Sequence, residues 1–109
     1  SGSGLRYMIY KKGKGQKAAK GMTATVAYSV KLITGDVVYS SEELGPMQFQ
    51  IGKGDVISGL EEGILFLRLG DEAKFIIPSH LAYGLVGDGD RIPGKATLIY
   101  DLKLLKLNN

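Results

Sequence analysis

Two long segments of the chain alternate between apolar and more polar residues at every second position. Successive side chains of a β-strand point to opposite faces of the sheet, so this alternation predicts strands with one buried face. The predicted core-facing residues are Ala24, Val26, Tyr28, Val30 and Leu32 in the first segment, and Ala96, Leu98, Tyr100, Leu102 and Leu104 in the second. Half-buried strands of this kind are typical of antiparallel sheets.

Shorter segments extend the strand pattern. Met47, Phe49 and Ile51 alternate with two glutamines. Further strands are predicted over residues 5–10, 37–39 and 72–77, with a turn at residues 34–36. Sixteen glycines among 109 residues favour turns and strands over long helices.

One short helix is predicted from residue 58 onward. Ser58 is followed three residues later by Glu61, which matches a capping box. An apolar stripe at helical spacing follows, formed by Leu60, Ile64 and Leu67. Gly59 and Gly63 lower helix propensity, so we expect the helix to be short and held by packing. The elements together predict an α+β domain in which an antiparallel sheet curls around one helix.

Composition excludes several classes of function. The chain has no cysteine and one histidine, His80, so neither thiol chemistry nor a histidine-rich metal site is expected. Five lysines lie between Lys11 and Lys20, but no aromatic residues interleave them, so nucleic-acid binding is not expected. No apolar run has the length of a membrane span. Residues 1–4 (SGSG) resemble a cloning remnant, and residues 5–109 are expected to form a single domain.

The stretch AYGLVGDGDRIP, residues 82–93, allows three interpretations. Its glycines could hold a phosphate, but the lysine and serine of a phosphate-binding loop do not follow them. Asp88 and Asp90 could bind calcium, but the downstream bidentate glutamate is absent. The remaining interpretation is that Tyr83 and Ile92 border an apolar pocket, while residues 88–91 influence which peptides approach it.

Apolar and aromatic residues gather at the ends of the predicted segments. They could line one cavity between sheet and helix, or they could be ordinary core residues. The candidates are Tyr28, Val38, Met47, Val56, Ile57, Leu60, Tyr83, Ile92 and Tyr100. Ile57 directly precedes the predicted helix, where free amides face outward. Tyr83 lies at the mouth of a glycine-rich loop, which favours the cavity.

Three runs of sequence resemble the FKBP family of peptidyl-prolyl isomerases. They are TVAYSVKLITGDVVYSS, GKGDVISGLEEGILFLRLGDEAKFIIPSHLAYG and IPGKATLIYDLKLLKL, and the resemblance covers about residues 13–107. It implies a five- to six-stranded curved antiparallel sheet wrapped around one short α-helix. It also implies an enzyme that accelerates X-Pro rotation without a cofactor or metal.

The resemblance implies a set of site residues. The catalytic candidates are Tyr83, Ile57, Tyr28 and Tyr39, and the substrate-binding candidates are Val38, Met47, Asp55, Val56, Leu60, Ile92 and Tyr100. The Ile57 amide and the Tyr83 hydroxyl are expected to donate to substrate carbonyls. The family's aspartate on the hairpin is replaced by Tyr39, which is expected to supply a hydroxyl instead. Met47 and Leu60 stand where the family has aromatic residues, and Val38 replaces its phenylalanine.

The implied partners are proline-containing peptides and unfolded or client proteins, with weak binding of FK506-type macrolides. A monomer is expected. The alternative is a module that binds proline segments, or acts as a chaperone, with little turnover; a purely structural domain is a third interpretation. The stretch VVYSSEELG resembles gliding-motility-associated FKBP-like lipoproteins, which favours a periplasmic or membrane-anchored location with a trimmed signal over a cytoplasmic one.

Overall fold

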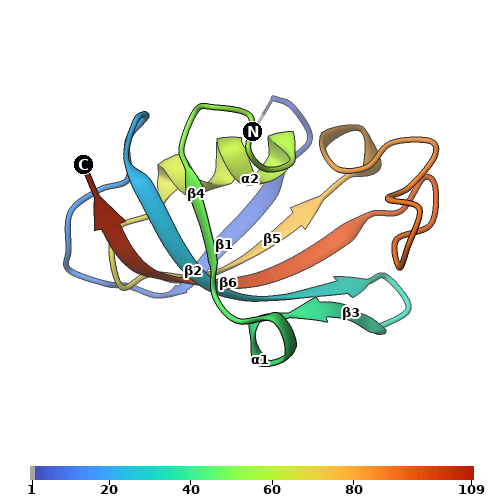
Figure 1. Ribbon diagram of the computed structural model, residues 1–109, viewed down its shortest axis with the longest axis horizontal. Helices are drawn as coiled ribbons and strands as arrows, with labels where there is room; N and C mark the ends of the chain where they lie inside the picture. The colour runs from blue at the N-terminus through green and yellow to red at the C-terminus, as the bar shows by residue number, and fades with distance from the viewer. Residues whose placement is uncertain (1) are drawn as a thin grey trace.

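A six-stranded antiparallel sheet forms the framework of the computed structural model, which describes residues 2–109 (Figure 1). The strands are β1 (Arg6–Lys11), β2 (Thr23–Leu32), β3 (Val37–Ser40), β4 (Met47–Gln50), β5 (Glu72–Ile77) and β6 (Leu98–Asn108). The helical segments are α1 (Ser41–Leu44), α2 (Ser58–Gly63), η1 (Ile64–Phe66) and η2 (Ser79–Leu81). The α+β fold predicted from the alternation and from the family resemblance is confirmed.

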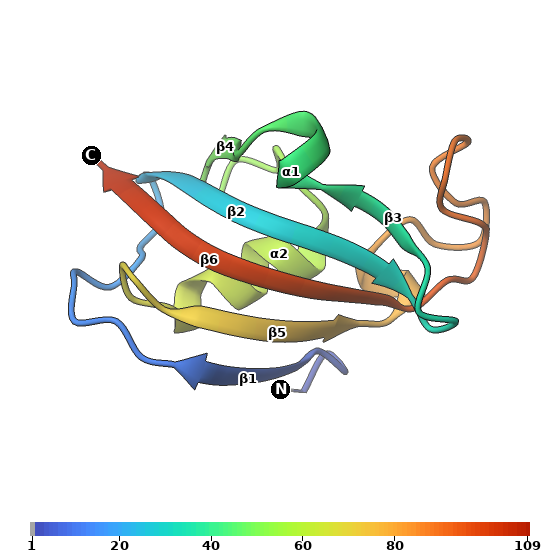
Figure 2. The same ribbon diagram turned by 90° about the horizontal axis from the view of Figure 1, so that it is seen from below.

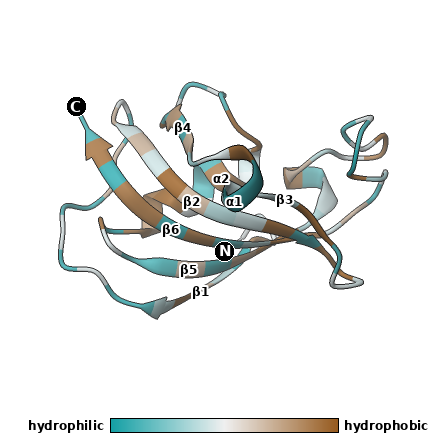
Figure 3. Ribbon diagram, turned by 60° about the horizontal axis from the view of Figure 1, so that its bottom comes forward, coloured by the Kyte–Doolittle hydropathy of each residue, from teal (hydrophilic) through white to brown (hydrophobic). Residues whose placement is uncertain are grey.

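The sheet order is β1-β5-β6-β2-β3, and β4 also pairs with β2. The two segments with the strongest alternation, β2 and β6, are neighbours at its centre, with Thr23 opposite Asn108 and Leu32 opposite Leu98. Bands of apolar and polar residues run along both strands (Figure 3). Val26 and Leu104 are among the buried residues of the inner face, which curves around α2 (Figure 2).

One edge of β2 is interrupted. Antiparallel partners occupy its two ends, β3 at Ser29–Lys31 and β4 at Thr23–Val26, and α1 lies between them. At the gap the Ser41 hydroxyl accepts from the Tyr28 amide (3.0 Å) and donates to the Tyr28 carbonyl (3.2 Å). One side chain thus satisfies the backbone groups of Tyr28 that a continuous strand would otherwise pair.

The predicted capping box is wrong. The N-cap of α2 is Ile57, which has no side chain that can cap, and Ser58 is already the first helical residue. Glu61 does not reach back to the cap; its Oε2 accepts from the Gly52 amide (2.6 Å) in the preceding loop. The hydroxyl therefore lies one position too late in the chain to cap the free amides. The residues of the predicted stripe, Leu60, Ile64 and Leu67, are all buried. Only Leu60 lies in α2, because Ile64 belongs to η1 and Leu67 follows it in extended backbone.

The glycines of α2 allow the helix to lie directly on β5. A Cβ on Gly59 would overlap Cγ2 of Ile77, and one on Gly63 would lie 3.0 Å from Cζ of Phe75. Both partners are fully buried. The residues that weaken the helix on its own are therefore those that bring it close to the sheet.

Candidate functional site

A cavity of about 230 Å³ opens where β2, β3, β4 and β6 meet the loop after η2. It is lined mainly by aromatic and apolar side chains: Tyr28, Val30, Tyr39, Leu44, Met47, Tyr83, Asp88 and Tyr100. We refer to it as the tyrosine cavity. The lining residues come from β2, β3, α1, β4, β6 and the loop after η2, which the fold brings together.

Five of the eleven predicted site residues line the tyrosine cavity: Tyr28, Tyr39, Met47, Tyr83 and Tyr100. The sequence reasoning missed three others as site residues. Val30 could have been predicted as a site residue, because it lies two residues after Tyr28 and therefore on the same face of β2. Leu44 belongs to the one-turn helix α1, which no periodicity indicates. Asp88 was considered as a calcium ligand and as part of a loop that influences which peptides approach.

The tyrosines differ in exposure and share one protonation state. Tyr100 is only 5% exposed, and burial raises the pKa of its phenol. Tyr83 is 36% exposed, and its pKa is raised first by burial and then by the negative charge of Asp88. The hydrogen bond to Asp88 raises the pKa of Tyr39 to about 12. These three hydroxyls therefore keep their protons at neutral pH.

Asp88 joins the 82–93 loop to β3. Its Oδ2 accepts from the Tyr39 hydroxyl, and its Oδ1 accepts from the amides of Asp90 (2.9 Å) and Ile92 (2.8 Å). The Asp88 amide in turn donates to the Ile92 carbonyl (3.0 Å). The carboxylate thus shapes the loop and attaches it to the hairpin. The proton of the Tyr39 hydroxyl is engaged by Asp88, whereas the prediction assigned it to substrate.

Arg91 makes a second attachment. Its guanidinium donates to the Val38 carbonyl (2.9 Å) and to Glu43 Oε1 (2.7 Å). It also lies over the Tyr39 ring, 5.1 Å from the centroid, at a distance where a cation and an aromatic face attract. Val38 borders a separate shallow hollow with Arg91 and Glu43, outside the tyrosine cavity.

The other predicted site residues do not line the tyrosine cavity. Leu60 and Ile92 are 2% and 3% exposed and belong to the core. Val56 and Ile57 are half-buried and pack against that core before α2. Asp55 is exposed, and its Oδ2 accepts from the Gln50 amide (3.1 Å), which fixes the loop after β4.

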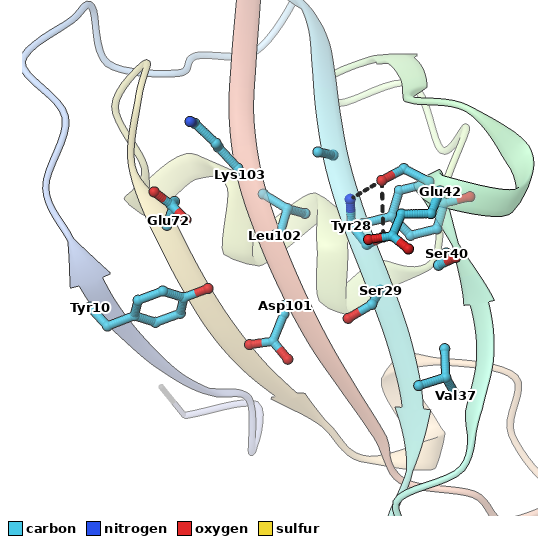
Figure 4. Close-up of a pocket in the computed structure, with 12 residues that line it drawn as sticks. Tyr10, Tyr28, Ser29, Val37, Ser40, Glu42, Glu72, Asp101, Leu102 and Lys103 are labelled. Atoms are coloured by element: carbon cyan, nitrogen blue, oxygen red, sulfur yellow. Dashed lines mark hydrogen bonds between the residues drawn. The ribbon is translucent and has the colours of Figure 1, made fainter.

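A wider hollow, of about 450 Å³, lies on the outer face of the sheet (Figure 4). Figure 4 shows Tyr10, Asp101 and Lys103 there on β1 and β6, away from α2. Its lining includes four charged side chains, those of Glu42, Glu72, Asp101 and Lys103, whereas ligand sites are mostly apolar with few charged groups. The tyrosine cavity is therefore the candidate site despite its smaller volume.

Two absences concern the described residues, 2–109. No three or more histidine, aspartate or glutamate side chains there are grouped closely enough to hold a metal ion. None of the helices in the same range is long and apolar enough to cross a membrane.

The chain is similar to known proteins along most of its length. Residues 14–105 match the family model described as FKBP-type peptidyl-prolyl cis-trans isomerase. The chain is 45% identical over 106 residues to "Probable FKBP-type peptidyl-prolyl cis-trans isomerase FkpA" of Neisseria meningitidis, covering 96% of the chain and 38% of that protein. It is 47% identical over 95 residues to "FK506-binding protein 2" of Yarrowia lipolytica, covering 86% of the chain and 66% of that relative.

Two solved structures are similar over nearly the whole chain. The crystal structure of AtFKBP13 superposes with a TM-score of 0.92 at 34% identity, covering 95% of this chain and 93% of that one. The crystal structure of FkpA from Escherichia coli gives a TM-score of 0.91 at 35% identity, covering 99% of this chain and 50% of that one.

Proposed function

The chain belongs to the family of FKBP-type peptidyl-prolyl cis-trans isomerases, and we propose that it accelerates rotation about X-Pro bonds in protein substrates and so assists their folding. The observation that carries the proposal is the tyrosine cavity, in which neutral phenols surround an apolar space. Residues 5–109 are proposed to act as one isomerase domain.

The chemistry requires no covalent intermediate. Rotation about an X-Pro bond is slow because it breaks amide resonance, at a barrier of roughly 18–20 kcal/mol. The planar amide is more dipolar than the twisted one, so an apolar cavity disfavours the ground state relative to the transition state. Lowering the barrier by about 5 kcal/mol would accelerate rotation on the order of 10³- to 10⁴-fold.

In this proposal the proline ring enters the tyrosine cavity. Tyr28, Met47 and Tyr100 provide the apolar surface around the ring. Tyr83 is neutral and 36% exposed, so its hydroxyl can donate to a substrate carbonyl beside the proline. Tyr39 could donate to substrate only by exchanging its hydrogen bond to Asp88.

The residues around the cavity have supporting roles. The Ile57 amide is proposed as a second donor, because Ile57 is the N-cap of α2 and free amides at a helix start carry partial positive charge. Leu60 and Ile92 support the binding surface from the core, and Val56 lies beside Ile57. Val38 and Asp55 are proposed to contact the flanking peptide from β3 and from the loop before α2.

Exchange NMR on an Ala-Leu-Pro-Phe peptide tests the proposal. We expect the cis-trans exchange rate to rise with protein concentration, and Tyr83→Phe to lower kcat/KM about tenfold, since loss of one transition-state donor costs on the order of 1–3 kcal/mol. Tyr10→Phe, on the outer face of the sheet, is the matched control and should change nothing. An unaccelerated rate at high protein concentration would overturn the enzyme proposal.

The second candidate is a module that binds proline segments or client proteins with little turnover. It is favoured by the engagement of the Tyr39 hydroxyl with Asp88, which leaves fewer donors for the twisted amide. It predicts that the same peptide binds without faster exchange. Macrolide binding is proposed to be weak, because the cavity of about 230 Å³ is smaller than the roughly 300–1,000 Å³ that holds drug-sized ligands.

A further inference from the structure

One wall of the tyrosine cavity carries a carboxylate. Asp88 is the only charged side chain among the residues that line the cavity in the described part of the chain. Its neighbours there are phenols and apolar side chains, including Tyr39, Tyr83 and Leu44. A single charge beside low-polarity surface acts on a bound peptide more strongly than the same charge in open water.

The local hydrogen bonds keep Asp88 ionised. Three donors point at its two oxygens: the hydroxyl of Tyr39 and the amides of Asp90 and Ile92. Hydrogen bonds to a carboxylate favour its charged form, and they lower the pKa of Asp88, with the Tyr39 bond as the largest cause. These donors are neutral, so the carboxylate is solvated by the protein but keeps its full negative charge.

No ion pair neutralises that charge within residues 2–109. The ion pairs found there are Lys11–Glu72, Lys74–Asp101 and Arg91–Glu43. Arg91 is the nearest cation along the chain, and it is held by Glu43, the Val38 carbonyl and the Tyr39 ring. Asp90, exposed two residues after Asp88, adds a second negative charge on the same loop.

The negative field reaches the proposed catalytic hydroxyl. The charge of Asp88 contributes to the raised pKa of Tyr83, although burial is the larger cause. A field that acts on Tyr83 also acts on peptide groups bound next to it. A positive side chain beside the proline would gain from this field, and a negative one would lose.

We propose that Asp88 makes this site select X-Pro segments that carry a lysine or arginine next to the proline. The inference rests on the proposed function of the tyrosine cavity, since it assumes that the proline ring binds there. Asp88 acts as a specificity-determining residue: it lies at the cavity wall, it is charged, and its charge is uncompensated until a cationic peptide binds.

Peptides of the form Ala-Xaa-Pro-Phe and Ala-Ala-Pro-Xaa, with lysine, glutamine or glutamate at Xaa, test the inference. Both kcat/KM by exchange NMR and Kd by chemical-shift titration are measured, so selectivity is read with or without turnover. In at least one series we expect the lysine peptide to have about threefold higher kcat/KM, or about threefold tighter binding, than the glutamine peptide. The glutamate peptide should be about threefold weaker than the glutamine peptide, which is the scale of a partly exposed charge pair. The lysine advantage should shrink when the salt concentration is raised about tenfold, from roughly 0.05 to 0.5 M, because salt screens charge pairs.

Asp88→Asn separates charge from shape. The asparagine oxygen can still accept from the Asp90 and Ile92 amides, and its NH2 group replaces the oxygen that accepts from Tyr39. The substitution removes the charge, so the lysine advantage should disappear. Tyr39→Phe removes the hydrogen bond between Tyr39 and Asp88 but keeps the charge, so the lysine advantage should persist even where kcat falls. Asp101→Asn, the same change on the outer face of the sheet, is the matched control.

The outcomes separate the two proposals. Lysine selectivity in Kd without faster exchange would overturn the enzyme proposal and support the role of Asp88. Faster exchange that is equal for lysine, glutamine and glutamate would overturn the role of Asp88 and leave the enzyme proposal standing. Equal loss of selectivity in Tyr39→Phe and Asp88→Asn would also overturn it, because loop position rather than charge would then be responsible.

Discussion

Helix α2 and the 82–93 loop are both fixed against strands, but by different kinds of contact. The helix is held by close apolar packing, with Gly59 against Ile77 and Gly63 against Phe75. The loop is held by polar contacts to β3 and α1, through Asp88 and Arg91. Packing of the first kind stabilises the whole fold, whereas contacts of the second kind fix one segment locally.

The largest expected effect is on the helix side. Gly59→Val would place a branched side chain against Ile77, and we expect the free energy of unfolding in urea to fall by about 3 kcal/mol, the upper end for an overpacked core. Ser58→Ala is the neighbouring control: its hydroxyl does not occupy the N-cap, so the change should stay within about 0.5 kcal/mol. A stable Gly59→Val protein would mean that α2 does not lie as close to β5 as described.

A smaller and local effect is expected on the loop side. Tyr39→Phe removes the hydrogen bond between β3 and Asp88 and leaves the core untouched. The Ile92 amide, which donates to Asp88, should then exchange with solvent several times faster, while the urea midpoint changes little. Unchanged exchange at Ile92, or a cooperative loss of stability, would show that the loop is held in another way.

The smallest effect on the attachment of the 82–93 loop is expected from changes of pH around neutrality. The pKa of Asp88 is lowered, so the stability that its carboxylate gives to the loop attachment is complete above the usual aspartate pKa. It is lost only as the pH falls through the lowered pKa. The pKa of Tyr39 is raised to about 12, so its contribution is complete below the usual tyrosine value of 10.0 and is lost as pH rises through about 12. The loop attachment should therefore be constant between about pH 5 and 10.

The phenol carbon shift of Tyr39, followed by NMR from pH 8 to 12.5, measures this titration. Asp88→Asn removes the charged acceptor, and we expect the Tyr39 midpoint to move back toward 10.0. A wild-type midpoint near 10.0 would contradict the hydrogen bond between Tyr39 and Asp88.

The strands were predictable because their signal is local. Alternation along β2 and β6 records which face is buried, and Val26 and Leu104 lie there as expected. The capping-box prediction was wrong although Ser58 and Glu61 have the right spacing. The position of the first helical turn depends on the path of the preceding loop, which places Ile57 at the N-cap. That entry is a tertiary feature, so spacing alone cannot fix it.

The candidate site was predictable only in part. Tyr28, Tyr83 and Tyr100 could be proposed from the family resemblance, and the structure brings them to one cavity. The contact of Tyr39 with Asp88 joins residues 49 positions apart, and it depends on a loop in which Gly87 and Gly89 both have positive φ. No short-range pattern encodes such a contact, because the backbone path of the loop decides which side chains meet.

The hydroxyl of Ser41 has a consequence for how the sheet can vary in length. It satisfies both backbone groups of Tyr28 at the gap between β3 and β4, while the pairing with β6 along the whole strand holds the register of β2. Insertions or deletions after Leu44 would therefore be absorbed outside the sheet, at a surface turn. Leu44 borders the tyrosine cavity, so the rim of the site can be redesigned by changing loop length there without rebuilding the core.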